Sequence, residues 1–94
     1  MDREVRAFRF LVSGVVQGVG FRWSASDRAM ALGLTGWVRI AADGRVELVA
    51  DGGPEDLGRF ASWLREGPPG SRVESVESEA IPPSCAFHSF RIER

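Results

Sequence analysis

The alternation of apolar and polar residues predicts a strand in the first part of the chain. Over residues 7–16, Phe8, Phe10 and Val12 fall on one face and Arg9 falls on the other. Successive side chains of a strand point to opposite faces, so this pattern is typical of a strand that covers a core on one side only.

Four later segments also have the character of strands. Residues 35–41 and 45–50 are rich in apolar and β-branched residues, and Asp43-Gly44 between them is a strong hairpin signal. Residues 72–79 alternate imperfectly among polar residues, which predicts an exposed or edge strand. Residues 87–92 complete the pattern with a last short strand.

Two segments have helical spacing instead. Residues 22–32 read as a helix that Gly33 ends, and a second helix begins at Pro54 and ends before Gly67-Pro68-Pro69-Gly70. The second helix has one apolar face at positions i, i+3, i+4 and i+7, formed by Leu57, Phe60, Ala61 and Leu64.

The resulting order is strand-helix-strand twice, followed by a terminal strand. Two split βαβ halves joined by a hairpin predict an α/β (α+β) fold, the ferredoxin-like sandwich. We expect a mostly antiparallel sheet of four to five strands with two helices on one face. Residues 1–94 contain no linker, so we expect a single domain.

Charge argues against polyanionic partners. The net charge is −1, so no basic field favours nucleic acid or an anionic membrane, and no apolar run is long enough to span one. All 12 basic residues are arginine, which removes lysine-based chemistry and the lysine of the nucleotide-binding P-loop. Any anion site must therefore be local.

The chain has one cysteine, Cys85, and one histidine, His88. An intramolecular disulfide and a Cys/His metal cluster are therefore excluded, and we expect no metal or cofactor. This usage fits a cytoplasmic protein. Cys85 lies beside Pro82-Pro83 without a partner base and is expected to be inert, and His88 is expected at the surface or in packing.

A glycine-rich turn joins the first predicted strand to the first predicted helix. Three glycines occur within seven positions, Gly14 to Gly20, and Arg22 follows. Glycines let a backbone approach a ligand closely, and amides at a helix N-terminus attract anions, so the turn predicts a phosphate cradle. The turn runs through Val16, Gln17, Gly18, Val19, Gly20, Phe21 and Arg22.

Other interpretations of these residues stay open. The turn could be an ordinary strand-to-helix connection. Gln17 could contact a ligand or brace the loop. Trp23 and Trp37 favour packing over substrate contact.

Residues 12–22, Val-Ser-Gly-Val-Val-Gln-Gly-Val-Gly-Phe-Arg, resemble the first signature of the acylphosphatase family. Gly36-Trp37-Val38-Arg39, with the following 43–47, resembles the second. The resemblance extends over nearly the whole chain. It implies a small hydrolase that cleaves carboxyl-phosphate bonds without a metal or a phospho-enzyme. It also implies that the backbone amides of residues 16–22 bind the phosphate, and that Arg22 is catalytic and grips the phosphate oxygens.

One position departs from the family pattern. The family has an asparagine directly after Gly-Trp-Val-Arg, where it orients the attacking water, and this chain has Ile40. Isoleucine cannot hydrogen-bond a water. The chain could be a natural member with weak turnover or a variant engineered to trap a complex. Alternatively, a polar neighbour could orient the water, and those nearby in sequence are Ser13, Thr35, Arg39 and Asp43.

The sequence therefore predicts an enzyme, an acylphosphatase that hydrolyses small acyl phosphates, with activity weakened or lost at Ile40. The alternative is a non-catalytic module that binds phosphate, sulfate or an acyl phosphate. A nucleic-acid-binding module is disfavoured, because the 45–50 strand has no aromatic residue. The polar 72–79 strand would blunt edge pairing and favours a monomer.

Overall fold

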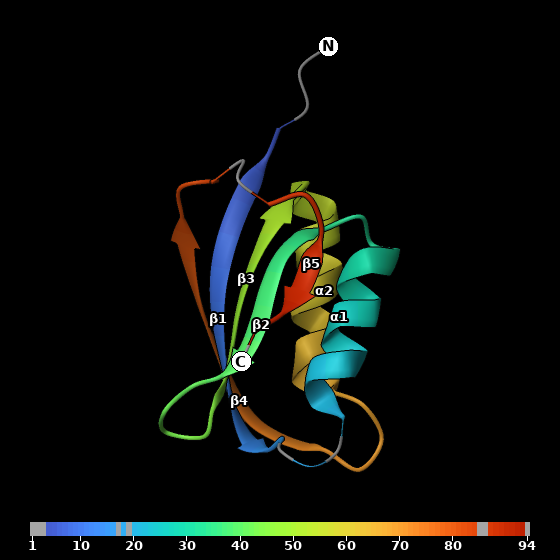
Figure 1. Ribbon diagram of the computed structural model, residues 1–94, viewed down its shortest axis with the longest axis vertical. Coiled ribbons are helices and arrows are strands. Elements are labelled where there is room, and N and C mark those ends of the chain that lie inside the picture. Colours follow the sequence, from blue (N-terminus) through green and yellow to red (C-terminus); the bar gives the residue numbers. More distant parts are fainter. Residues whose placement is uncertain (1–3, 17, 19, 85–86, 94) are drawn as a thin grey trace.

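The computed structural model describes residues 4–16, 18, 20–84 and 87–93, and the fold is an α+β sandwich. The five strands form one sheet in the order β4-β1-β3-β2-β5, antiparallel except between β2 and β5. Both helices pack on one face of that sheet and leave the other face open (Figure 1). In chain order the elements are β1 (Arg6–Val15), α1 (Phe21–Ala31), β2 (Thr35–Ile40), β3 (Val46–Gly52), α2 (Pro54–Glu66), β4 (Arg72–Ile81) and β5 (Phe90–Ile92).

The predicted ferredoxin-like fold is confirmed, and so are the hairpin and the edge position of β4. The start of the last strand was predicted wrongly, at Phe87 instead of Phe90. β5 pairs with β2 only from Gly36 onward, and β2 begins at Thr35. Phe87 and His88 therefore have no stretch of β2 beside them, whereas the Ser89 carbonyl still accepts from the Gly36 amide at 3.1 Å.

The core lies between the helices and the inner face of the sheet, and Phe60 of α2 is at its centre. The Phe60 ring meets those of Phe10 and Phe90 edge-on, at centroid distances of 6.0 and 5.9 Å, and stacks on Trp63 at 6.3 Å. Offset and edge-to-face ring pairs add to the stability that burial provides. These contacts tie α2 to both β1 and β5.

Gly36 of the second motif is a packing requirement. It is buried in β2 with φ +142°, and a Cβ at this position would collide with the backbone carbonyl of Val49 in β3. Backbone atoms inside a sheet cannot move aside cheaply, so the sheet needs glycine here.

We expect Gly36→Ala to destabilise the protein by about 3 kcal/mol or more, because it combines backbone overlap with a disfavoured φ. Gly58→Ala is the matched control: Gly58 is exposed within α2, and an added Cβ there meets nothing within 4 Å. That control should gain about 0.5–1 kcal/mol, because alanine is the better helix former. Urea unfolding of both variants measures the difference, and equal stabilities would refute the steric argument.

On the open face of the sheet, charged side chains from three strands form an ionic cluster. Glu47 of β3 accepts from Arg9 of β1 at 2.6 Å and from Arg39 of β2 at 2.8 Å. The Glu47 side chain is only 7% exposed. Burial opposes its ionisation, but the hydrogen bonds from Arg39 and Arg9 outweigh burial and hold the pKa of Glu47 below its ordinary value of 4.5. The cluster thus joins the three central strands.

We expect Glu47→Gln to cost about 1–2 kcal/mol of unfolding free energy at pH 7, since it removes the charge between two guanidinium groups. A lowered folded-state pKa gives stability that is full above the unfolded value, near 4.5, and lost as pH falls through the folded value. The gap between parent and variant should therefore narrow below about pH 4.5. Urea titrations at several pH values test this, with Glu79→Gln, on the exposed edge strand, as the control.

Two further observations concern metals and membranes. Within the described residues, no group of three or more His, Cys, Asp or Glu side chains is placed to hold a metal ion. No helix in the same part of the chain has both the length and the apolar character needed to cross a membrane.

Candidate functional site

The candidate site lies at the end of the sheet where β1 and β2 finish and β3 begins. Val12 of β1 pairs with Val46 of β3, and Val46 pairs with Ile40 of β2, so the three residues form one row across the sheet. β1 ends and α1 begins at this same end of the fold (Figure 1). The two family motifs therefore meet at one end of the fold.

Two buried side chains anchor the loop. Val16 is 2% exposed and Phe21 is 1% exposed, and the Phe21 ring lies 5.7 Å from that of Trp63. Both side chains turn toward the core, whereas Gly18 and Gly20, which lie between them in sequence, are exposed. Gln17 and Val19 lie outside the described residues, so the roles expected of them stay predictions.

The described glycines of the loop adopt left-handed conformations. Gly18 has φ +72° and Gly20 has φ +71°, and both are exposed. A Cβ added to either would meet nothing within 4 Å. Glycine is therefore needed for the backbone conformation, while the space around it is open enough for a ligand.

The start of α1 is organised unlike an ordinary helix start. Its N-cap, Gly20, provides no side-chain cap, and the first turn holds no acidic residue. Arg22 lies in that turn, whereas α2 begins with Pro54, Glu55 and Asp56. A cation at the positive end of a helix is unfavourable by about 0.3–1 kcal/mol. A bound anion would reverse that cost, because free amides and a guanidinium would both face it.

Arg22 is half-buried, and no ion pair is formed by its side chain within the described residues. By contrast, Arg9 and Arg39 form ion pairs with Glu47, and Arg45 forms one with Asp43. Arg22 thus keeps its donors available for a ligand.

Ile40 is at the same end of the sheet, on the inner face. It is half-buried, and its row partners Val46 and Val12 are fully buried. Two inter-strand spacings, about 10 Å in all, separate β1 from β2. The side chain at this position faces the helices, and in this protein it offers only hydrocarbon.

Two of the polar neighbours that could replace the missing asparagine point to the open face. Arg39 forms an ion pair with Glu47 on that face, with 2.7 Å between Arg39 Nη2 and Glu47 Oε1. Ser13 lies four residues from Arg9 along β1 and so shares its outward face. Neither side chain reaches the inner face that Ile40 occupies.

The other two polar neighbours lie elsewhere. Thr35 starts β2 and pairs with Asp51, at the opposite end of the sheet from Ile40. Asp43 is in the hairpin, where the Arg45 amide donates to it at 3.1 Å and the guanidinium at 2.8 Å. The amide first and then the guanidinium lower the pKa of Asp43, so its carboxylate stays ionised and engaged.

The tryptophans divide between packing and exposure. The prediction of a packing role is wrong for Trp23, whose side chain in the first turn of α1 is 68% exposed. Trp37 is half-buried on the open face, with the Arg39 guanidinium 5.1 Å from its ring centroid, which confirms packing. His88 is exposed, as expected, and Cys85 lies outside the described residues.

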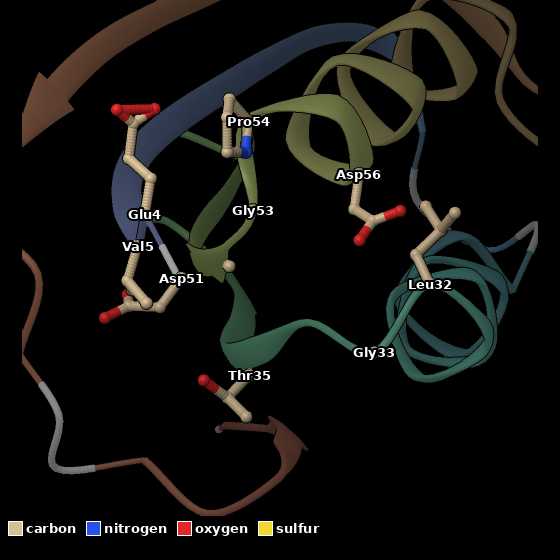
Figure 2. A pocket seen from close by; sticks show the side chains of 10 residues that line it. Glu4, Val5, Leu32, Gly33, Thr35, Asp51, Gly53, Pro54 and Asp56 are labelled. Carbon is tan, nitrogen blue, oxygen red and sulfur yellow. The ribbon is translucent and has the colours of Figure 1, made fainter. Parts of the chain in front are cut away.

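A pocket of about 530 Å³ opens at the far end of the sheet, and its charge is wrong for phosphate. Glu4, Asp51 and Asp56 line it, together with Thr35 and the chain around Gly33 (Figure 2). Carboxylates would repel an anion there. The size of this cavity therefore does not argue against the loop as the anion site.

Similarity to known proteins agrees with the geometry. Residues 8–92 match the family model described as Acylphosphatase. An acylphosphatase of Koribacter versatilis is 52% identical over 85 residues, which cover 90% of this chain and 77% of that protein.

Solved structures give the same result. An acylphosphatase from Coxiella burnetii has a TM-score of 0.91 and 40% identity, covering 95% of this chain and 93% of that one. An acylphosphatase from Bacillus subtilis has a TM-score of 0.90 and 34% identity, covering 97% of this chain and 100% of that one. With the signature loop, the split βαβ fold and Arg22 at the start of α1, these matches show that the chain belongs to the acylphosphatase family.

Proposed function

We propose that this protein hydrolyses small acyl phosphates to a carboxylate and inorganic phosphate. The observation that carries the proposal is the start of α1, where Arg22 and the open backbone of Gly20 occupy the first turn and no acidic residue is present. Membership of the acylphosphatase family supports the reaction class.

In the proposed reaction, the loop amides and the Arg22 guanidinium hold the phosphoryl oxygens. Charge-assisted contacts of this kind are strong and directional. A water oxygen attacks phosphorus while the bond from phosphorus to the acyl oxygen breaks, and the acyl group leaves as a carboxylate. The water releases its proton to solvent as phosphate forms. Fixed donors favour this step because they match the charge on the transferring group.

Positioning of the water is the weak part of the site. Ile40 cannot accept or donate a hydrogen bond, and its four polar neighbours are turned away or engaged elsewhere. Loss of an orienting group costs on the order of 10²- to 10⁴-fold in rate. We therefore propose that phosphate binding is intact and turnover is slow.

The alternative function is a non-catalytic module that binds phosphate or an acyl phosphate, and Ile40 is the observation that favours it. The two functions differ in turnover but share the same loop. We further propose that the chain acts as a monomer in the cytoplasm. The exposed edge strand β4 is rich in glutamate and serine, which disfavours pairing with a second copy, and the single cysteine fits a reducing compartment.

Two measurements on the unmodified protein test the proposal. Disappearance of benzoyl phosphate, followed against a buffer blank, reports turnover, and calorimetric titration with inorganic phosphate reports binding. Turnover above the blank with phosphate binding supports the enzyme. Binding without turnover supports the module, and a protein that neither binds phosphate nor hydrolyses benzoyl phosphate would refute both.

A further inference from the structure

An exposed apolar side chain lies at each end of the candidate loop. Four large apolar residues of the described chain are prominently exposed, and the two most exposed are Trp23 at 68% and Val15 at 56%. Val15 ends β1 just before the loop, and Trp23 follows Arg22 just after it. Exposure of a tryptophan to this extent leaves a large apolar surface in water, which suggests that a ligand covers it.

Trp23 differs from the other two tryptophans in the ring contacts that it makes with the described residues. Trp63 contacts Phe21, Phe60 and Arg28, and Trp37 contacts Arg39. In the described part of the chain, the Trp23 ring has no aromatic or cationic neighbour of this kind. Its position is therefore not explained by packing.

The direction of the side chain brings Trp23 toward the loop. Side chains in an α-helix lean toward the helix N-terminus, so the Trp23 indole is expected to lean toward the loop end of α1. It leaves Gly20 uncovered, because a Cβ added there would meet nothing within 4 Å. Trp23 is 68% exposed whereas Arg22, the residue before it, is half-buried, so the indole extends farther into solvent than the Arg22 side chain does. A phosphate held at the loop would have its acyl substituent directed outward, beside this ring.

We propose that Trp23 is the acyl-group contact and makes this protein prefer aromatic over small aliphatic acyl phosphates. The proposal rests on the proposed function for the position of the phosphate. An aryl acyl group would stack on the indole, whereas an acetyl group is too small to cover much of it. Trp23 then contributes to substrate binding and leaves the phosphate contacts unchanged.

The first test compares benzoyl phosphate and acetyl phosphate as substrates. Trp23→Ala should lower kcat/KM for benzoyl phosphate about 3- to 10-fold and for acetyl phosphate less than 2-fold, as expected for loss of one ring contact. Competitive inhibition by inorganic phosphate should not change, and Trp23→Phe should restore most of the preference. Met30→Ala, which removes another exposed apolar residue of α1 (54%), should change neither substrate. Equal losses on both substrates, or no loss on either, would overturn the proposal.

A second test does not need turnover. The ligands are two phosphonate analogues in which a methylene replaces the bridging oxygen of the acyl phosphate. One carries a phenyl group on the carbonyl carbon, like benzoyl phosphate, and the other a methyl group, like acetyl phosphate. Each is titrated against the parent and Trp23→Ala. Weaker binding of the phenyl compound alone supports the acyl contact, even if the parent hydrolyses nothing and the proposed enzyme activity fails. Equal binding of the phenyl compound by parent and variant, or no binding to the parent, would overturn it.

Discussion

Arg22→Ala is expected to lower kcat/KM for benzoyl phosphate at least about 10³-fold, because an arginine that stabilises a transferring phosphoryl group contributes about 10³ to 10⁵ in rate. Phosphate binding should weaken with it. The same change should leave stability equal or raise it by up to about 1 kcal/mol, since it removes a cation from the positive end of α1. Steady-state kinetics and urea unfolding measure the two effects.

The combination of lost activity and undiminished stability distinguishes a ligand-binding arginine from a structural one. Arg28→Ala is the matched control, because Arg28 lies in the last turn of the same helix, 5.7 Å from the Trp63 ring centroid. It should retain turnover and lose some stability. An Arg22→Ala protein that keeps phosphate binding and turnover would show that the loop is not the site.

Ile40→Asn is expected to raise kcat for benzoyl phosphate by about 10²-fold or more, because it supplies an amide that can orient the attacking water. The inner-face position of Ile40 at the end of β2 puts the new side chain at the same end of the fold as Arg22. The substitution should cost about 1–2 kcal/mol, since it places a polar group in a half-buried position. Single-turnover and steady-state rates of parent and variant measure the gain.

Two further variants define what a gain would mean. Ile40→Val changes the hydrocarbon and adds no polar group, so it should stay as slow as the parent. The double variant with Arg22→Ala should lose the gain, because an oriented water is of no use without a held phosphate. If the parent is already fast and Ile40→Asn adds nothing, then Ile40 does not mark a defective water site.

Most of the fold followed from local patterns. Alternation in β1, helical spacing in α2 and Asp43-Gly44 between β2 and β3 fix the order of elements, because each depends on residues close in sequence. The start of β5 did not follow, because it depends on where β2 begins. The ion pairs of Glu47 were also not predicted. The alternation of residues in β3 indicates only on which face of the sheet Glu47 lies, whereas strand register places Arg9 and Arg39 beside it.

The sequence by itself determined the loop, its glycines and Arg22, because a strand-to-helix turn is contiguous along the chain. It also determined that the asparagine position holds isoleucine. Only the tertiary structure decided that Ile40 faces inward at the loop's end of the sheet while Arg39 turns outward to Glu47, since strand register sets both. The exposure of Trp23 was likewise decided by the fold, because a helical position is buried or free according to what packs against it.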